Sequence, residues 1–229
     1  MISIITPTYN EAKNIENLVK KISESLRDIE YEIVVSDDNS PDGTAKLAKE
    51  LSKKYPVNVL VRTKDKGLSP AVVDGFKIAK GDIFGVIDAD LSHPPETIPK
   101  MLKAMKETDS DIVVASRLIN GGGTEDWPNS RKLTSYIATT LARPLTRIKD
   151  PMSGFFILRK EVIKDAKLTT KGYKILLEIL VKGNYKKAVE VPFIFRDRTA
   201  GQSKLNLKTN IQYLKQLASL YFYKVTRLF

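Results

Sequence analysis

Residues 2–115 alternate between short β-branched runs and longer segments with apolar residues at helical spacing, and this alternation constrains the fold more than any other feature. The runs that read as strands cover residues 2–6, 31–36, 57–62, 83–87 and 111–115. Helices are expected between them, over residues 14–26, 44–54, 68–80 and 94–107. Strands that alternate with helices of this length form right-handed βαβ units. We therefore expect an α/β fold, with a mainly parallel, twisted sheet and helices on both faces.

The regular alternation ends after residue 115. A loop is expected around residues 121–128, followed by helices over 129–145 and 172–181 and strands over 154–158 and 188–195. The chain shows no internal repeat and no low-complexity linker. We expect one catalytic domain over residues 1–206 and an amphipathic C-terminal helix, able to lie at a membrane interface, over residues 207–229.

Composition limits the partners of the chain. The 38 Lys and Arg residues against 27 Asp and Glu residues give a net charge of +11, which predicts anionic partners or simply a solvated basic surface. There is no cysteine, which excludes disulfides, thiolate metal sites and thiol catalysis. The N-terminus does not read as a signal peptide, and no run reaches 18 apolar residues. We expect a soluble or peripheral protein at the cytoplasmic face of a membrane.

Acidic and polar residues follow three of the expected strands. They are PTYNE at residues 7–11, DDNSPD at residues 37–42 and DAD at residues 88–90. Each motif alone is an ordinary turn or cap. The carboxyl ends of parallel strands meet at one edge of the sheet, however, where ligands bind. Three acidic clusters at that edge would repel one another unless a cation or a donor-rich ligand lay between them.

The residue types restrict the metal. Carboxylate oxygens without cysteine, and with a single histidine, suit Mg²⁺ or Mn²⁺ better than zinc or copper. Mg²⁺ usually takes one or two carboxylates together with substrate phosphates, so the DAD motif suggests a bridge to a diphosphate. No glycine-rich phosphate loop is present. Basic side chains would then have to share the phosphate charge, and the candidates are Arg117, Arg131, Lys132, Arg198 and Lys204.

The order of the motifs carries a resemblance to a known family. PTYNE, VVSDDNSPDGT, DADLSHPPE, SR, WP-x-x-RK, DPMSGFF and a basic loop follow one another from residue 1 to about residue 208. This order resembles the inverting nucleotide-sugar glycosyltransferases of the GT-A fold, and within them the dolichyl- (polyprenyl-) phosphate mannose synthases. The resemblance implies transfer of mannose from GDP-mannose to a polyprenyl phosphate with inversion, with Mg²⁺ or Mn²⁺ as cofactor.

The same resemblance implies roles for individual residues. Those matching the nucleotide-sugar pocket are Pro7, Tyr9, Glu11, Ser36, Asp38, Asp88, Ala89, Asp90, Lys174, Arg198 and Lys204. Those matching the acceptor-phosphate site are Arg117, Arg131 and Ser135. Asp88 and Asp90 would hold the metal, and Asp90, Arg117 and Arg131 would carry the chemistry. Ser135 and Lys174 also fit plain surface positions.

The sequence departs from the family at one expected metal ligand. Ser92 stands where many members have glutamine, so it would reach the ion through water or not at all. The single histidine, His93, precedes two prolines and reads as a structural turn residue. No base is required, because a phosphate monoester with a second pKa near 6 is largely a dianion at neutral pH and is already a nucleophile.

The C-terminal segment bears on membrane contact. Residues 196–229 contain seven Lys and Arg residues and one acid, with apolar residues at helical spacing and several aromatics. Such a helix can lie in the headgroup region of a bilayer or pack on its own domain. Some members of the family that the sequence resembles continue into transmembrane helices. Two alternatives are therefore a missing transmembrane region and a membrane-anchoring partner.

Three other functions remain open at this point. A UDP-sugar donor with the same lipid acceptor would need the same fold, metal and phosphate contacts. A nucleotidyltransferase would usually show a glycine-rich N-terminal loop, which PTYNEAKN lacks. Nucleic-acid binding rests on charge alone, and the aromatics gather in the terminal helix instead of alternating with basic residues. We expect a nucleotide-sugar donor, a polyprenyl phosphate acceptor and a membrane surface as partners, and no nucleic acid.

Overall fold

The computed structural model describes residues 1–125, 127–169, 174–196 and 207–226, with side chains of the last helix from residue 211 onward. Its strands are β1 (Ile2–Thr8), β2 (Tyr31–Asp37), β3 (Val57–Val61), β4 (Ile83–Val86), β5 (Ile112–Ser116), β6 (Gly123–Thr124), β7 (Phe156–Arg159), β8 (Ala188–Pro192) and β9 (Ile194–Phe195). Its α-helices are α1 (Ile15–Ser25), α2 (Thr44–Leu51), α3 (Leu68–Ile78), α4 (Ile98–Thr108), α5 (Asn129–Ala142), α6 (Ile175–Lys182) and α7 (Leu207–Thr226). Short 3-10 turns, η1 (Pro95–Thr97), η2 (Arg143–Leu145) and η3 (Lys160–Ile163), join some of them.

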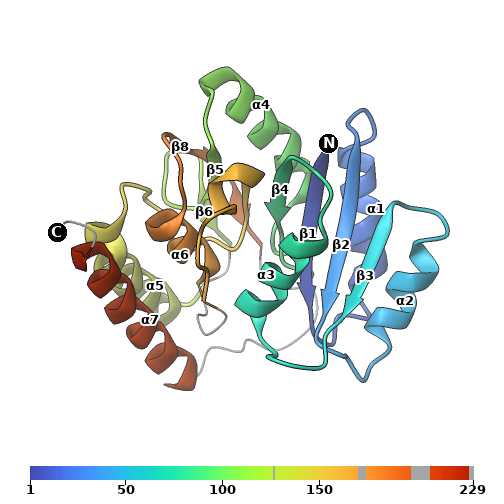
Figure 1. Ribbon diagram of the computed structural model, residues 1–229, viewed down its shortest axis with the longest axis horizontal. Coiled ribbons are helices and arrows are strands. Elements are labelled where there is room, and N and C mark those ends of the chain that lie inside the picture. Colours follow the sequence, from blue (N-terminus) through green and yellow to red (C-terminus); the bar gives the residue numbers. More distant parts are fainter. Residues whose placement is uncertain (126, 170–173, 197–206, 227–229) are drawn as a thin grey trace.

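A seven-stranded sheet forms the centre of the molecule, in the order β3-β2-β1-β4-β7-β5-β8 (Figure 1). Strand β7 runs antiparallel to β4 and β5, and the other pairs are parallel. The α/β expectation is therefore confirmed, including the mainly parallel sheet. The short pair β6-β9 lies outside this sheet.

Alternate residues of the strands supply two separate cores. Ile4 of β1 packs in the core beneath α1, α2 and α4, whereas its neighbour Ile5 packs in the core beneath α3 and α6. Both side chains are fully buried, because successive residues of a strand point to opposite faces of the sheet. Two covered faces explain why the parallel strands are almost continuously hydrophobic.

Helices α5 and α7 form a smaller cluster beside α6 (Figure 1). From α7, the buried side chains of Tyr213, Leu217 and Leu220 pack against Leu177 of α6. The Tyr213 hydroxyl donates to the carbonyl of Ala138 in α5 at 2.6 Å. One side of α7 therefore packs on its own domain, as one of the two alternatives predicted. No helix among the described residues is long and apolar enough to cross a bilayer.

Candidate active site

The ends of β1 and β2 bring the first two sequence motifs together. Pro7 and Ser36 are register partners in the parallel pair, and Thr8 is opposite Asp37. Ser36 is fully buried, and its hydroxyl has no hydrogen-bond partner among the described residues. The predicted nucleotide-site residues Pro7 and Ser36 thus lie side by side at the carboxyl edge of the sheet.

Tyr9 and Glu11 follow β1 at the same edge. Tyr9 is exposed, with the Lys66 ammonium 6.0 Å from its ring centroid. Glu11 Oε2 accepts a hydrogen bond from the Asn14 side chain at 2.8 Å. An exposed ring beside a cation is a suitable surface on which a nucleobase could stack.

The acidic pair after β2 does not need a metal ion for its charge. Asp38 pairs with the buried Arg62 guanidinium, and its Oδ2 accepts from the Gly67 N–H at 2.7 Å. Asp37 accepts from Thr8 Oγ1 at 2.9 Å and from the backbone N–H of Ser40 at 2.8 Å. Protein donors already surround this cluster, so its charge does not depend on the cation or donor-rich ligand expected between the three acidic clusters.

The DAD motif lies just beyond β4. Asp90 is 4% exposed, and its Oδ1 accepts from the backbone N–H of Ser92 at 3.1 Å and from the Ser92 hydroxyl at 2.6 Å. Leu91 between them has a φ of 63°, which is unusual for a residue with a branched side chain. Such strain is typical of functional sites. Ala89 is buried, and the Asp88 side chain is 28% exposed.

His93 supports this motif from the protein interior. Its ring stacks on Phe155 at a centroid distance of 5.2 Å and meets the edges of Phe193 and Phe195. The backbone N–H of Asp88 donates to His93 Nδ1 at 3.2 Å, which places the ring proton on Nε2. Burial lowers the pKa of His93. A neutral, enclosed imidazole of this kind is structural, as the sequence suggested.

Gly154 keeps space for Asp88. A Cβ atom at residue 154 would lie 3.2 Å from Asp88 Oδ2 and 3.2 Å from His93 Cε1. A methyl group would therefore press on the carboxylate and on the ring behind it. The glycine in the DPMSGFF motif leaves the Asp88 carboxylate in place.

Arg117 extends from the end of β5 to Asp150. Its Nε and one terminal nitrogen bind the two carboxylate oxygens at 2.8 and 2.7 Å, and its backbone N–H donates to the same carboxylate at 3.0 Å. Asp150 is fully buried. The bidentate geometry holds the guanidinium in one orientation, so Arg117 is oriented by protein before any ligand is present.

Arg131 lies over the indole ring of Trp127, with its guanidinium carbon 4.0 Å from the ring centroid. The ring is also 5.3 Å from the guanidinium carbon of Arg117. One aromatic ring therefore holds two of the predicted acceptor-phosphate residues near each other. Ser135, one turn further along α5, is half-buried.

Lys174 joins the same group of charges at the start of α6. Burial, together with the nearby cations Arg117 and Arg131, lowers its pKa from 10.5 to about 8, while Asp88 and Asp150 act in the opposite direction. The donor-side and acceptor-side residues of the sequence prediction are thus close enough to influence one another. Backbone groups of Lys174 exchange two 3.1 Å hydrogen bonds with the side chain of Gln216, which ties α7 to the site.

Two predicted residues, Arg198 and Lys204, lie outside the described residues. Within the described part of the chain, no group of three or more His, Cys, Asp or Glu side chains could hold a metal ion. Among the described residues, the site therefore offers the two carboxylates Asp88 and Asp90 and few further ligands. This is the ligand set expected where substrate phosphates complete the coordination.

Sequence reasoning missed the residues that hold the site in position. Asp150 and Gly154 stand in the DPMSGFF motif, which marked the resemblance without giving either residue a role. Arg62, which neutralises Asp38, ends the expected third strand and carried no signal of its own. Gln216 looks in the sequence like any other polar residue of an amphipathic helix, and nothing there indicated its hydrogen bonds to Lys174.

Comparison with known proteins identifies the family. The model of glycosyl transferase family 2 matches residues 3–166. The chain belongs to glycosyl transferase family 2. The matched region contains the three motifs at the carboxyl edge of the sheet, PTYNE, DDNSPD and DAD. It also contains Arg117, Arg131 and the DPMSGFF motif that begins with Asp150. Lys174 and helices α6 and α7 lie beyond it.

Two curated relatives of this family 2 glycosyltransferase are named dolichol-phosphate mannosyltransferase. The protein of Pyrococcus furiosus is 54% identical over 96% of this chain, which spans 63% of that relative's length. The protein of Saccharomyces cerevisiae is 40% identical over 97% of this chain, which spans 87% of that relative. The similarity thus extends past the family match into α7.

A solved structure shares the fold of the transferase. It is the mannosyltransferase PcManGT from Pyrobaculum calidifontis in complex with GDP-Man and Mn²⁺. The TM-score is 0.66 at 20% identity, covering 99% of this chain and 64% of that one. This likeness confirms the GT-A fold that the sequence resemblance implied.

Proposed function

We propose that this chain transfers mannose from GDP-mannose to a polyprenyl (dolichyl) phosphate with inversion at the anomeric carbon. One observation carries the proposal: Arg117, Arg131 and Lys174 lie close to the DAD motif at one edge of the sheet. Cations beside carboxylates suit a reaction between two phosphate-bearing substrates. The names of the 54% and 40% identical relatives favour this donor and acceptor over a UDP-sugar donor.

The proposed acceptor needs no side chain that acts as a base. The one histidine of the chain is buried against phenylalanines and has a lowered pKa. A phosphate monoester is already largely a dianion at neutral pH and needs no deprotonation. Arg131 and Lys174 would offset the repulsion between the two anions, and Arg117 would present its guanidinium in the orientation that Asp150 imposes. Attack opposite the departing diphosphate gives the inverted product.

Asp88 and Asp90 fit a hard divalent cation, which we propose is Mn²⁺ or Mg²⁺. Their oxygens are of the right type, and the partly exposed Asp88 carboxylate is open to a ligand from solution. When bound, such an ion supplies charge stabilisation for the departing nucleoside diphosphate. Ser92 directs its hydroxyl at Asp90 and would orient that carboxylate. Contact of Ser92 with the ion through a water molecule stays a prediction.

The proposal is tested by incubating the purified chain with GDP-mannose, a short polyprenyl phosphate in detergent, and Mn²⁺. The expected product is a polyprenyl phosphate mannose with a β linkage, identified by its NMR coupling constants. An α-linked product, or transfer from UDP-glucose at an equal rate, would contradict the proposal.

The pH dependence of donor binding should report Lys174. With a pKa of about 8, Lys174 is mainly charged at pH 7 and mainly neutral at pH 9, so affinity for the anionic donor is expected to fall about tenfold or less as the pH rises through 8. Burial disfavours the charged form of Lys174, so this side chain lowers the stability of the fold most at pH values below 8. This unfavourable contribution becomes smaller as the pH rises from 8 towards 10.5. Calorimetry of wild type and Lys174→Met across this range measures the effect. The variant should bind weakly at pH 7 and lack the inflection; an unchanged inflection would contradict the role.

The acceptor requires contact with lipid, and α5 and α7 offer the surface for it. The exposed apolar residues of the two helices are Leu133, Tyr136, Ile137, Leu141, Ile211, Leu214, Phe222 and Val225. Soluble proteins rarely expose so many large apolar side chains on neighbouring helices. We propose that these two helices contact the membrane surface, on the cytoplasmic side expected from the sequence.

Charged substitutions on these helices should weaken binding to vesicles. Replacing Ile137 and Phe222 by glutamate is expected to lower the coefficient for partition onto vesicles about tenfold or more. The transfer of two large apolar side chains from water into lipid would then no longer contribute to binding. Leu47→Glu with Ile78→Glu is the control, since both residues are exposed large apolar side chains on other helices, α2 and α3. Co-sedimentation with lipid vesicles measures both. An equal loss in the control would argue against a specific membrane face.

A further inference from the structure

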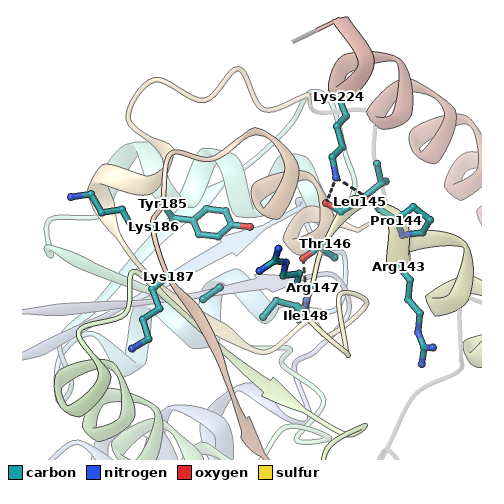
Figure 2. Close-up of a pocket in the computed structure, with 11 residues that line it drawn as sticks. Arg143, Pro144, Leu145, Thr146, Arg147, Ile148, Tyr185, Lys186, Lys187 and Lys224 are labelled. Carbon is teal, nitrogen blue, oxygen red and sulfur yellow. Dashed lines mark hydrogen bonds between the residues drawn. The ribbon is translucent and has the colours of Figure 1, made fainter. Parts of the chain in front are cut away.

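A pocket lies where the loop after α5, the residues before β8 and the last turn of α7 meet (Figure 2). Its volume is about 480 Å³, within the range that holds small organic ligands. It borders the start of β8, whereas the candidate active site lies at the carboxyl ends of β1, β2, β4 and β5. The lining residues are Arg143, Pro144, Leu145, Thr146, Arg147, Ile148, Tyr185, Lys186, Lys187, Ala188 and Lys224.

The lining is strongly basic. Five of its side chains are cationic, and none is a carboxylate. Within the described part of the chain, none of these five side chains forms an ion pair. Figure 2 shows Arg147 near the middle of the lining residues, Lys224 entering from α7, and Lys186 and Lys187 towards the edge. Like charges gathered around one hollow favour the binding of an anion.

Two acids near the pocket accept hydrogen bonds from backbone groups. Asp111 Oδ2 accepts from the backbone N–H of Lys186 at 2.7 Å and of Lys187 at 3.1 Å. Glu190 accepts from the backbone N–H groups of Lys149 and Asp150 at 2.9 and 3.1 Å. These carboxylates shape the loops around the pocket and do not line it.

Helix ends explain only part of the basic lining. Arg143 caps the end of α5, and the Lys224 ammonium donates to the carbonyls of Pro144 and Leu145 at 2.9 and 3.3 Å. Cations are favourable at both places because of the helix dipole. Arg147 and Lys186 lie on a loop and before a strand, and no such local role accounts for them.

We propose that this pocket binds a phosphate-bearing anion, with Arg147 as its main contact and Lys186 as a second cation at its edge. An arginine fork matches phosphate oxygens bidentately, and a second cation matches the second charge of a phosphate monoester. The anion could be the headgroup of a membrane lipid, since the exposed apolar residues Leu141 and Val225 stand on the last turns of α5 and α7 beside the pocket, or a soluble phosphate ester. The inference does not depend on the proposed transfer reaction.

The test compares two double variants, each of which loses two positive charges. Arg147→Gln with Lys186→Gln alters the pocket, and Lys20→Gln with Lys21→Gln removes two exposed cations of α1 on another part of the molecule. Neither pair of side chains makes a hydrogen bond or ion pair within the described residues, so both variants should fold; thermal unfolding checks this. The probes are glycerol 3-phosphate in solution, followed by NMR or calorimetry, and phosphatidylcholine vesicles with or without phosphatidic acid.

Wild type and the α1 variant are expected to bind at least one of the two phosphate probes, and the pocket variant about tenfold more weakly. Loss confined to phosphatidic acid vesicles would support the site with a lipid headgroup as its ligand. Loss confined to glycerol 3-phosphate would support it with a soluble ligand. Binding of neither probe by wild type, or equal loss in the two variants, would overturn the proposal.

Discussion

Replacing Asp90 by asparagine is expected to lower kcat for sugar transfer by about 10³-fold while leaving the fold intact. The side chain is nearly the same size, and its Oδ1 can still accept the two hydrogen bonds from Ser92. What is lost is the negative charge that would hold a divalent cation against the donor diphosphate. Loss of one such charge-stabilising contact typically costs 10²- to 10³-fold, and weaker metal binding adds to it.

The control is Asp109→Asn, which removes the same charge from an exposed residue at the end of α4. Radiolabelled transfer at saturating donor measures kcat, and the melting temperature reports the fold. Asp90→Asn should melt like wild type and regain no activity with more acceptor. Turnover within tenfold of wild type at ordinary Mn²⁺ concentrations would show that Asp90 does not hold the ion.

Replacing Arg62 by methionine is expected to lower the free energy of unfolding by about 3–5 kcal/mol, the usual cost of removing one partner from a buried ion pair. Arg62 is buried, pairs with the buried Asp38 and binds Asp74 at 2.8 Å. Its loss would leave the Asp38 carboxylate inside the protein with the Gly67 N–H as its remaining donor among the described residues. Urea denaturation measures the change.

Two further variants separate the charge effect from general damage. Lys53→Met removes an exposed cation and should leave the unfolding curve unchanged, because exposed pairs contribute little. Adding Asp38→Asn to Arg62→Met should recover part of the lost stability, because the unpaired buried charge is then gone. A loss below about 1 kcal/mol in the single variant would contradict the buried-pair account.

The sequence predicted the sheet well because each strand pattern is local. The runs ending near Thr8, Asp37 and Val86 are continuous, buried and β-branched, and their helices carry apolar residues at the correct spacing. The direction of β7 could not be predicted, since a short run of three apolar residues, 156–158, looks alike in either orientation. The expected strand over residues 188–195 divides into β8 and β9 at Phe193, after Pro192, which has no N–H to continue the ladder.

The candidate site could be predicted only where it follows from strand ends. Asp88 and Asp90 lie at the carboxyl edge because β4 is parallel to β1, which the alternation implied. The pairings of Asp38 with Arg62 and of Arg117 with Asp150 join residues 24 and 33 positions apart. No local pattern encodes such contacts, so the sequence could not show that these charges were already matched inside the protein. The division into residues 1–206 and 207–229 stays a prediction.

The most direct measurement of the central claim is calorimetric titration of the chain with GDP-mannose, UDP-glucose and UDP-N-acetylglucosamine, each with and without Mn²⁺. A GDP-mannose transferase should bind GDP-mannose with Mn²⁺ and bind it much more weakly without the ion, and should bind both UDP-sugars weakly under either condition. Tighter binding of a UDP-sugar, or binding of GDP-mannose that Mn²⁺ does not change, would contradict the account.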